Sequence, residues 1–279
     1  MTSEHYIEEP NLSVAWARAL SAASARGCSE VGPLVVSVTG FDGSGAFQEE
    51  PIIRRALDAV LQREAMQSVE TVAGTIFPWS MWNPAAPRRQ LFERYQKIAP
   101  RLRRASGKNR RGIYFDRMIT GGPTGRENQL EFAIATYGGR NGVRRSVLQI
   151  GIFNPGQDHS AAAQLGFPCL QHVTFAPVDG GLCLNAFYAS QYMVERAYGN
   201  YVGLCRLGRF AAHELGLPLA RMTCFTGIAE CEVAKNKLST LLHAVDAVVA
   251  VEGQAAATPR PSTSFSAEQA LPTRPQAGA

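Results

Sequence analysis

The chain has 279 residues, of which 46% are hydrophobic and 18% charged, a composition typical of a globular protein with a substantial core. No apolar run reaches the roughly 18 residues of a membrane-spanning helix, and the acidic start lacks the order of a signal peptide. We therefore expect a cytoplasmic protein without a membrane partner. The net charge of +5 suits a small-anion site, and the densest basic run, at residues 101–111, contains no aromatic side chain for base stacking. We expect no nucleic-acid partner.

The first half of the chain is mainly helical by its pattern. Apolar residues recur at helical spacing over residues 12–26, 50–65 and 88–104. The β-branched run at residues 33–39 predicts a strand. Residues 71–87 hold two tryptophans among prolines, which indicates an irregular segment.

The second half alternates strands with helices. Strands are predicted at residues 147–153, 170–175, 181–189 and 221–229, and helices at residues 127–137, 199–215 and 233–251. Beyond residue 253 the sequence is rich in Ala, Pro, Ser, Thr and Gln, which cannot bury enough apolar surface to offset the entropy of ordering. We expect an α+β protein with a single domain over residues 1–252 and a disordered tail over residues 253–279.

The six cysteines show no pattern of a metal site or a disulfide framework, because there is no CxxC pair and no paired histidine spacing. We expect free thiols and no bound metal. Most would be small core residues, and the open question is whether one is reactive.

A series of polar motifs runs from Tyr114 to Glu232. An arginine pair, Arg144 and Arg145, precedes one strand, the dipeptide Pro168-Cys169 begins the next, and further motifs follow at Tyr188-x-Ser190 and at Asn200, before a long apolar helix. In this order and spacing the motifs resemble thymidylate synthase, particularly its shorter methanogen-type relatives, and more loosely the deoxycytidylate and CMP hydroxymethylases. The resemblance covers residues 114–232, whereas residues 1–110 match the family poorly.

The resemblance implies a fold, a set of roles and a partner. The fold would be a large mixed sheet flanked by helices, paired sheet to sheet in a homodimer. The implied roles are nucleophile for Cys169, base reader for Asn200, phosphate ligand for Ser190, substrate contact for Tyr114, and a phosphate clamp lent by the partner subunit for Arg144 and Arg145.

The proposed chemistry accounts for these residue types. A pyrimidine C5 is a poor nucleophile until a group adds to C6, and a cysteine thiolate suits that covalent step. Guanidinium groups stabilise a nearby thiolate and bind phosphate through two parallel hydrogen bonds. An asparagine amide offers a donor and an acceptor side by side, which complements a uracil-type edge. Asn200 could equally cap the helix that follows it.

Several positions depart from the family pattern. Ala189 replaces an arginine that contacts both phosphate and thiol, and Tyr192 replaces an aspartate that meets the pterin ring. Glu230 and Glu232 replace the histidine and tyrosine that hold the sugar hydroxyl, and carboxylates there would accept hydrogen bonds from a sugar or an amine. Trp82 is a candidate for the wall of a folate site beside Tyr192, with a core position as the alternative.

Three functional hypotheses follow. The first is a C5 methyl- or hydroxymethyltransferase that acts on a pyrimidine nucleotide or nucleoside through a covalent Cys169 adduct, with 5,10-methylenetetrahydrofolate as the carbon donor and a non-standard substrate. The second is a catalytically idle homologue that binds a nucleotide-like ligand or a partner protein. A third possibility is addition of Cys169 to another conjugated ring without folate.

Overall fold

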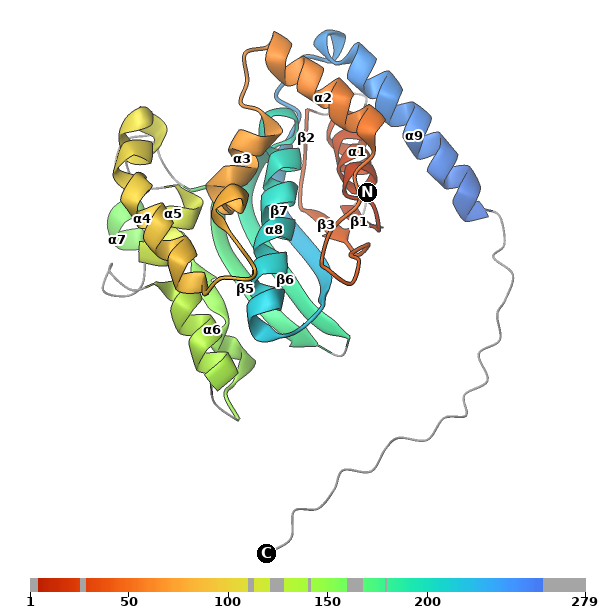
Figure 1. The fold of residues 1–279 in the computed structure, drawn as a ribbon. Helices are drawn as coiled ribbons and strands as arrows, with labels where there is room; N and C mark the ends of the chain where they lie inside the picture. The colour runs from red at the N-terminus through yellow and green to blue at the C-terminus, as the bar shows by residue number, and fades with distance from the viewer. Residues whose placement is uncertain are drawn as a thin grey trace, which may run out of the picture.

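The fold is a mixed β-sheet with helices packed against it, seen in a computed structural model (Figure 1). The structure describes residues 5–25, 29–109, 113–120, 128–139, 142–159, 168–178 and 180–257. The strands are β1 (His5–Glu9), β2 (Glu30–Val31), β3 (Leu34–Val38), β4 (Gln149–Gly151), β5 (Leu170–Val178), β6 (Gly181–Tyr192) and β7 (Leu219–Glu230). They form one seven-stranded sheet in the order β1-β3-β7-β6-β5-β4, with β2 paired to β7. The β1–β3 and β6–β7 pairs are parallel and the others antiparallel, so the predicted large mixed sheet is confirmed.

The α-helices are α1 (Leu12–Ala23), α2 (Pro51–Arg63), α3 (Val69–Ile76), α4 (Arg88–Ala105), α5 (Tyr114–Thr120), α6 (Gln129–Gly139), α7 (Pro155–Asp158), α8 (Tyr198–Leu215) and α9 (Ser239–Ala257). A π-helical turn, η4 (Met193–Ala197), joins β6 to α8, and a 3-10 turn, η3 (Arg145–Val147), precedes β4. Helices α1 and α8 pack on the sheet, α3 packs on α8, and α9 lies outermost against α1 and α2 (Figure 1). Helix α8 is the crossover that the parallel β6–β7 pair requires.

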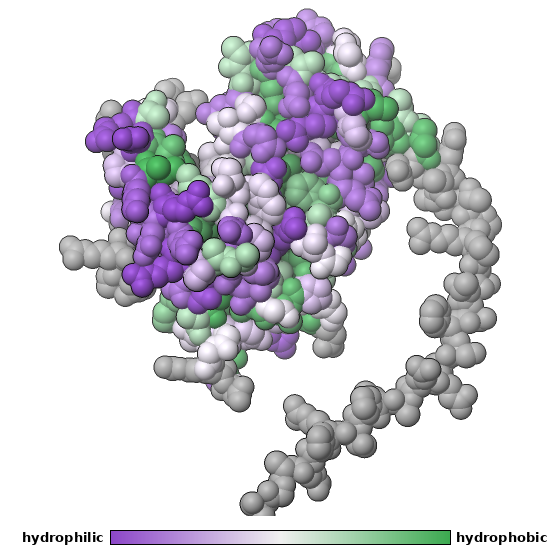
Figure 2. Space-filling view, viewed as in Figure 1, coloured by the Kyte–Doolittle hydropathy of each residue, from purple (hydrophilic) through white to green (hydrophobic). Residues whose placement is uncertain are grey.

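The two faces of the sheet differ in burial. Along β6, Leu184, Ala186 and Tyr188 are buried towards the helices, while Asn185 and Phe187 between them are exposed. This period of two is the alternation that the sequence shows, and it directs every second side chain away from the helices. The opposite face of the sheet therefore carries exposed apolar groups, whereas hydrophilic side chains gather over α2 and α4 on the helical side (Figure 2).

The structure corrects three sequence predictions. Residues 69–76 form helix α3 instead of an irregular segment, because Val69, Val72, Ala73 and Ile76 share one buried stripe and Ser68 caps the first turn. Helix α9 begins at Ser239 instead of residue 233 and continues to Ala257, so the first residues of the predicted tail are helical; residues 258–279 lie outside the described residues.

Close packing of α3 on α8 gives a first testable prediction. A Cβ atom on Gly203 would lie 2.9 Å from the carbonyl oxygen of Ala73, whereas one on Gly74 would meet nothing within 4 Å. We expect Gly203→Leu to lower the free energy of unfolding by about 1–3 kcal/mol through overpacking. Gly74→Ala should raise it by about 0.5–1 kcal/mol through helix propensity. Urea titration of both variants checks the contrast, and equal stability of Gly203→Leu and the parent would contradict the packing described.

Candidate functional site

Cys169 lies at the surface immediately before β5. Its carbonyl oxygen accepts a hydrogen bond from the Ala189 backbone N–H at 3.0 Å. This bond holds Cys169 beside the C-terminal part of β6. It is the exposed member of the five described cysteines; Cys183 is partly exposed and Cys205, Cys224 and Cys231 are buried. Burial raises the pKa of the Cys224 thiol to about 12 and that of Cys205 well above its ordinary value, which keeps both thiols protonated. Cys28 lies outside the described residues.

Two tyrosines, Tyr114 and Tyr188, lie next to Leu170, the residue that follows Cys169. The Tyr114 hydroxyl accepts a hydrogen bond from the Leu170 backbone N–H at 3.5 Å, and its ring meets that of Tyr188 edge-on at 6.5 Å. Burial, and next the charge of Cys169, raise the pKa of Tyr114 to about 12, so that its phenol stays protonated. The Tyr188 hydroxyl is buried and has no hydrogen-bond partner among the described residues. Tyr114 therefore presents a neutral phenol directly beside the Cys169 backbone.

Asn200 lies in the first turn of α8 and is only 3% exposed. Within the described parts of the chain no hydrogen bond to its side-chain amide is present. The residue that precedes α8 is Ala197, so the capping interpretation of Asn200 is wrong. The amide is not among the fully buried side-chain groups that lack a partner, so it retains some contact with solvent, where a ligand could bind it.

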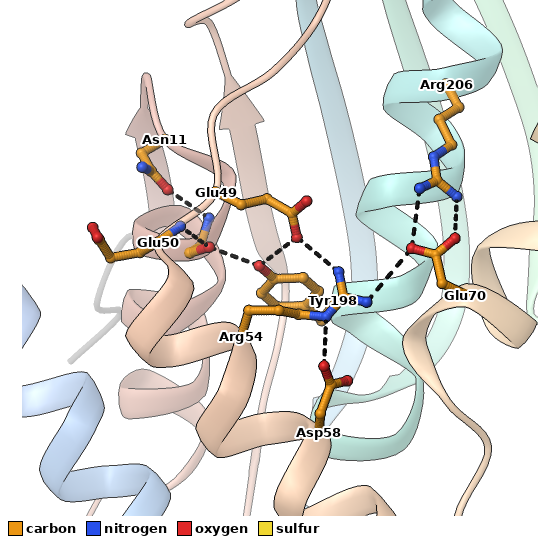
Figure 3. Close-up of polar contacts among 9 residues, drawn as sticks. Asn11, Glu49, Glu50, Arg54, Asp58, Glu70, Tyr198 and Arg206 are labelled. Atoms are coloured by element: carbon orange, nitrogen blue, oxygen red, sulfur yellow. Dashed lines mark hydrogen bonds and ion pairs between the residues drawn. The ribbon is translucent and has the colours of Figure 1, made fainter.

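A network of polar contacts anchors this end of α8 (Figure 3). The buried Tyr198 hydroxyl contacts the Ser13 hydroxyl at 2.7 Å and donates to Glu49 at 2.8 Å. Glu49 pairs with Arg54, whose guanidinium also lies 5.7 Å from the centre of the Tyr198 ring. These contacts tie α8 to α1 and α2 two residues before Asn200, and so fix the position of the asparagine.

Ser190, Tyr192 and Glu230 lie where β6 and β7 end. The alternation of buried and exposed residues along β6 breaks at Ala189 and Ser190, which are both exposed. The backbone N–H of Ala189 donates the hydrogen bond to the Cys169 carbonyl oxygen. Tyr192 pairs in register with Glu230 and is 46% exposed. The structure thus brings these three side chains to the same end of the sheet as Cys169.

Glu232 has a different role from the one that the resemblance implies. Its carboxylate accepts hydrogen bonds from the backbone N–H groups of Val194 (3.2 Å) and Glu195 (2.6 Å), in the first turn of η4. Burial raises the pKa of Glu232 above its ordinary value even though these bonds favour the carboxylate. Glu232 therefore caps η4 from beyond the end of β7, and its oxygens are already engaged.

This arrangement makes a prediction about Glu232 that depends on pH. Because the folded-state pKa is raised, the favourable contribution of the protonated group is present below the unfolded pKa and is lost as the pH rises through the folded pKa. The free energy of unfolding of Glu232→Gln, relative to that of the parent, should therefore increase from pH 4.5 to pH 7.5. Glu232→Ala should be about 1 kcal/mol less stable than the parent because the cap is lost. Urea unfolding at both pH values measures this, with Glu230→Gln as the control. A Glu232→Gln variant that loses stability relative to the parent as the pH rises would contradict it.

The arginine pair lies far from Cys169 within one chain. Arg144 and Arg145 are exposed, and Arg145 Nη1 donates to the Pro177 carbonyl oxygen at 2.9 Å. Pro177 is near the end of β5 and Cys169 precedes its beginning, a separation of roughly 26 Å at the usual rise per residue. The pair could contact a ligand at Cys169 only from a second chain.

Trp82 is also remote from the cluster around Cys169. Its ring packs edge-on against Phe210 at 5.8 Å and His213 at 5.5 Å, near the carboxyl end of α8. Asn200 lies in the first turn of α8, about 15 Å along the helix axis from Phe210. The structure therefore does not bring Trp82 together with Tyr192, and it favours the core interpretation of Trp82.

The sequence analysis missed Arg196, which lies in η4 one turn before Asn200. Its charge acts on Tyr114, where it lowers the pKa against the effect of burial. Nothing in the spacing of the motifs marks Arg196, because its relation to Tyr114 arises only from the packing of η4.

A cavity of about 450 Å³ lies beside β1, lined among others by Tyr6, Glu8 and Arg18. Strand β1 is at one edge of the sheet and β5 lies near the other, so the cavity is separate from the Cys169 site. The described residues contain no cluster of three or more metal-ligating side chains. Among them, no helix is long and apolar enough to cross a membrane.

Comparison with models of known protein families and with the sequences of characterised proteins finds no match to this chain.

Proposed function

We propose that this chain is a thymidylate synthase-like enzyme that transfers a one-carbon group to C5 of a pyrimidine nucleotide or nucleoside. The observation that carries the proposal is the placement of Cys169: an exposed thiol beside Tyr114, at the end of the sheet from which η4 and α8 lead to Asn200. A nucleophile and a base-reading group are the minimum that C5 substitution requires.

Each of three residues has one role in the proposed reaction. Asn200 holds the polar edge of the ring, and the Cys169 sulfur forms a bond to C6, which places the electron pair on C5 and the neighbouring carbonyl oxygen. C5 would then gain the one-carbon unit and lose its proton while the bond from that carbon to its donor breaks, with the electron pair leaving on the donor. Addition of a hydride or of water to the same carbon would give the methyl or hydroxymethyl product and expel the Cys169 thiolate from C6. Tyr114 keeps its proton because its pKa is raised, and it can donate a hydrogen bond to the sulfur or to the ligand.

The one-carbon donor is proposed to be 5,10-methylenetetrahydrofolate, which would supply an electrophilic carbon and, for a methyl product, the hydride that reduces it. The residues fit this group only in part: Tyr192 presents an exposed ring near the site, while Trp82 is held in a separate aromatic cluster.

A homodimer completes the proposal. Phe187 is 39% exposed on the open face of the sheet and stacks on Phe225 at 5.3 Å, which gives this face an apolar centre. A twofold dimer through this face would place Arg144 and Arg145 of one chain near the site of the other, which one chain cannot do alone.

Disruption of this face is a third prediction. We expect Phe187→Glu to raise the dimer dissociation constant by at least about 100-fold, because a twofold interface contains the substitution twice and central aromatic residues dominate binding. Phe132→Glu, on a residue that is 60% exposed on α6, is the matched control and should leave association unchanged. Sedimentation equilibrium distinguishes them, and equal association of both variants with the parent would exclude this face as the interface.

Release of tritium from a C5-tritiated pyrimidine tests the reaction itself. Uridylate, deoxyuridylate, cytidylate, deoxycytidylate and their nucleosides, each supplied with methylenetetrahydrofolate, cover the proposed substrates. We expect time-dependent tritium release for at least one of them.

The second candidate is an idle homologue that binds a nucleotide-like ligand. Two features favour it. Ala189 stands where the family that the motifs resemble has a phosphate-binding arginine, and the carboxylate of Glu232 already accepts hydrogen bonds from the backbone of η4. A rise in unfolding temperature with a nucleotide, without tritium release from any substrate, would select this candidate over the enzyme.

A further inference from the structure

The positive net charge of the chain arises in one segment. Residues 94–111 contain eight arginines and lysines and no aspartate or glutamate, and without these eight cations the net charge of +5 would be −3. The first part of the segment, up to Ala105, belongs to helix α4, which lies at one side of the helical layer (Figure 1). The charge is therefore concentrated on one part of the surface, where it can attract an anionic partner.

Helix α4 carries a line of cations opposite its buried face. Four exposed cations follow one another at intervals of three and four residues, and these are Arg94, Lys97, Arg101 and Arg104. This spacing places them on one side of the helix, in a line about 15 Å long at the usual helical rise. The side chains that α4 buries lie on the other side of the helix: Leu91, Phe92, Tyr95 and Ala99. We call the four exposed cations the α4 stripe.

The stripe differs from the other arginines of α4 in how its charge is balanced. Arg88 pairs with Glu131, and Arg103 pairs with Asp116. The four stripe cations have no carboxylate partner among the residues that the structure describes, and Arg94 donates to a backbone carbonyl oxygen at 3.2 Å. The stripe therefore presents its charge to solvent, as Figure 2 shows by the hydrophilic surface over α4.

The chemistry of the stripe favours a nucleic-acid duplex over a protein or a membrane. Within the described residues, α4 exposes no large hydrophobic side chain. Protein interfaces have aromatic and other apolar groups at their centre, and stable membrane binding requires an inserted apolar group beside the cations. A duplex, in contrast, carries one negative charge per about 1.7 Å of its axis and binds to cations alone, through the release of counterions.

We propose that the α4 stripe binds the phosphate backbone of a nucleic-acid duplex without sequence preference. The lack of aromatic side chains, from which the sequence predicted no nucleic-acid partner, counts against stacking on the bases of a single strand but not against contacts to phosphate. The stripe and its partner do not depend on Cys169 or on the proposed reaction.

Fluorescence anisotropy of a labelled DNA duplex tests the stripe in the whole chain. With a duplex of about 20 base pairs we expect an affinity that falls with salt, because the slope of log K against log salt is about −0.9 per phosphate contact. Lys97→Gln combined with Arg101→Gln should reduce the size of this slope by about 2 and weaken binding at least about tenfold at about 50 mM salt. A duplex of unrelated sequence should bind the parent protein within about twofold of the first.

The matched control removes two exposed cations away from α4, Arg55 on α2 and Lys235 in the turn before α9. Arg55→Gln combined with Lys235→Gln changes the net charge equally and should retain the slope of the parent. Equal losses in the two double variants would overturn the proposal, as would the absence of duplex binding at about 100 µM protein. Tighter binding of a single strand, of vesicles rich in phosphatidylserine or of polyglutamate than of the duplex would also overturn it.

Discussion

Replacement of Cys169 by alanine is expected to abolish turnover, with a loss of at least about 10⁴-fold in kcat. Without the sulfur no bond to C6 forms, and C5 of the pyrimidine is not activated. Ligand binding should persist, because Asn200, Tyr114 and Ser190 remain and the exposed Cys169 side chain contributes little to the core. Tritium release measures the first effect, and the ligand-induced rise in unfolding temperature measures the second.

The matched control is Cys183→Ala on β6, which removes a partly exposed thiol from the open face of the sheet. It should retain turnover within about twofold of the parent, since it lies outside the proposed chemistry. Turnover by the Cys169→Ala variant at the parent rate would rule out a covalent role for this residue.

Replacement of Asp158 by alanine is expected to lower the free energy of unfolding by about 3–5 kcal/mol. Asp158 is fully buried and accepts hydrogen bonds from Arg117 at 2.7 and 2.8 Å, and Arg117 is itself only 8% exposed. Removal of the carboxylate takes two hydrogen bonds and a neighbouring negative charge from a buried guanidinium. Asp158 also accepts from the Asn154 backbone N–H at 2.8 Å, so α7 should loosen as well.

The control for this prediction is the exposed pair of Arg89 and Glu93 on α4, which are 84% and 48% exposed. Glu93→Ala should change stability by less than about 0.5 kcal/mol, because solvent screens an exposed pair. Urea titration of the two variants gives the comparison. Similar losses in both variants would show that the pair of Arg117 and Asp158 contributes no more than a surface ion pair.

The sequence predicted the strands of the second half well because their apolar alternation is local, as in β6 and β7. It missed β1, whose residues His5–Glu9 are partly exposed at a sheet edge and show no apolar alternation. It also missed α3, where the tryptophans and prolines that follow obscured a short buried stripe. These errors concern segments whose structure depends on the elements that pack against them.

The candidate site was predicted in part. The motifs placed Cys169 directly before a strand and Asn200 at the start of a long helix, and both positions are as the structure has them. The engagement of Glu232 by η4 could not be predicted, because it depends on how η4 is oriented after β6. Spacing along a sequence shows which residues share a strand or a helix face, but not which contacts form between elements.

Mass analysis of the Cys169 peptide tests the central claim most directly. The protein is incubated with a 5-fluoropyrimidine nucleotide and methylenetetrahydrofolate, where fluorine at C5 prevents the proton loss that would release the sulfur. We predict that the Cys169 peptide gains the mass of the nucleotide together with the one-carbon donor. A Cys169 peptide of unchanged mass, with the ligand bound and removable by denaturation, would contradict covalent catalysis by this residue.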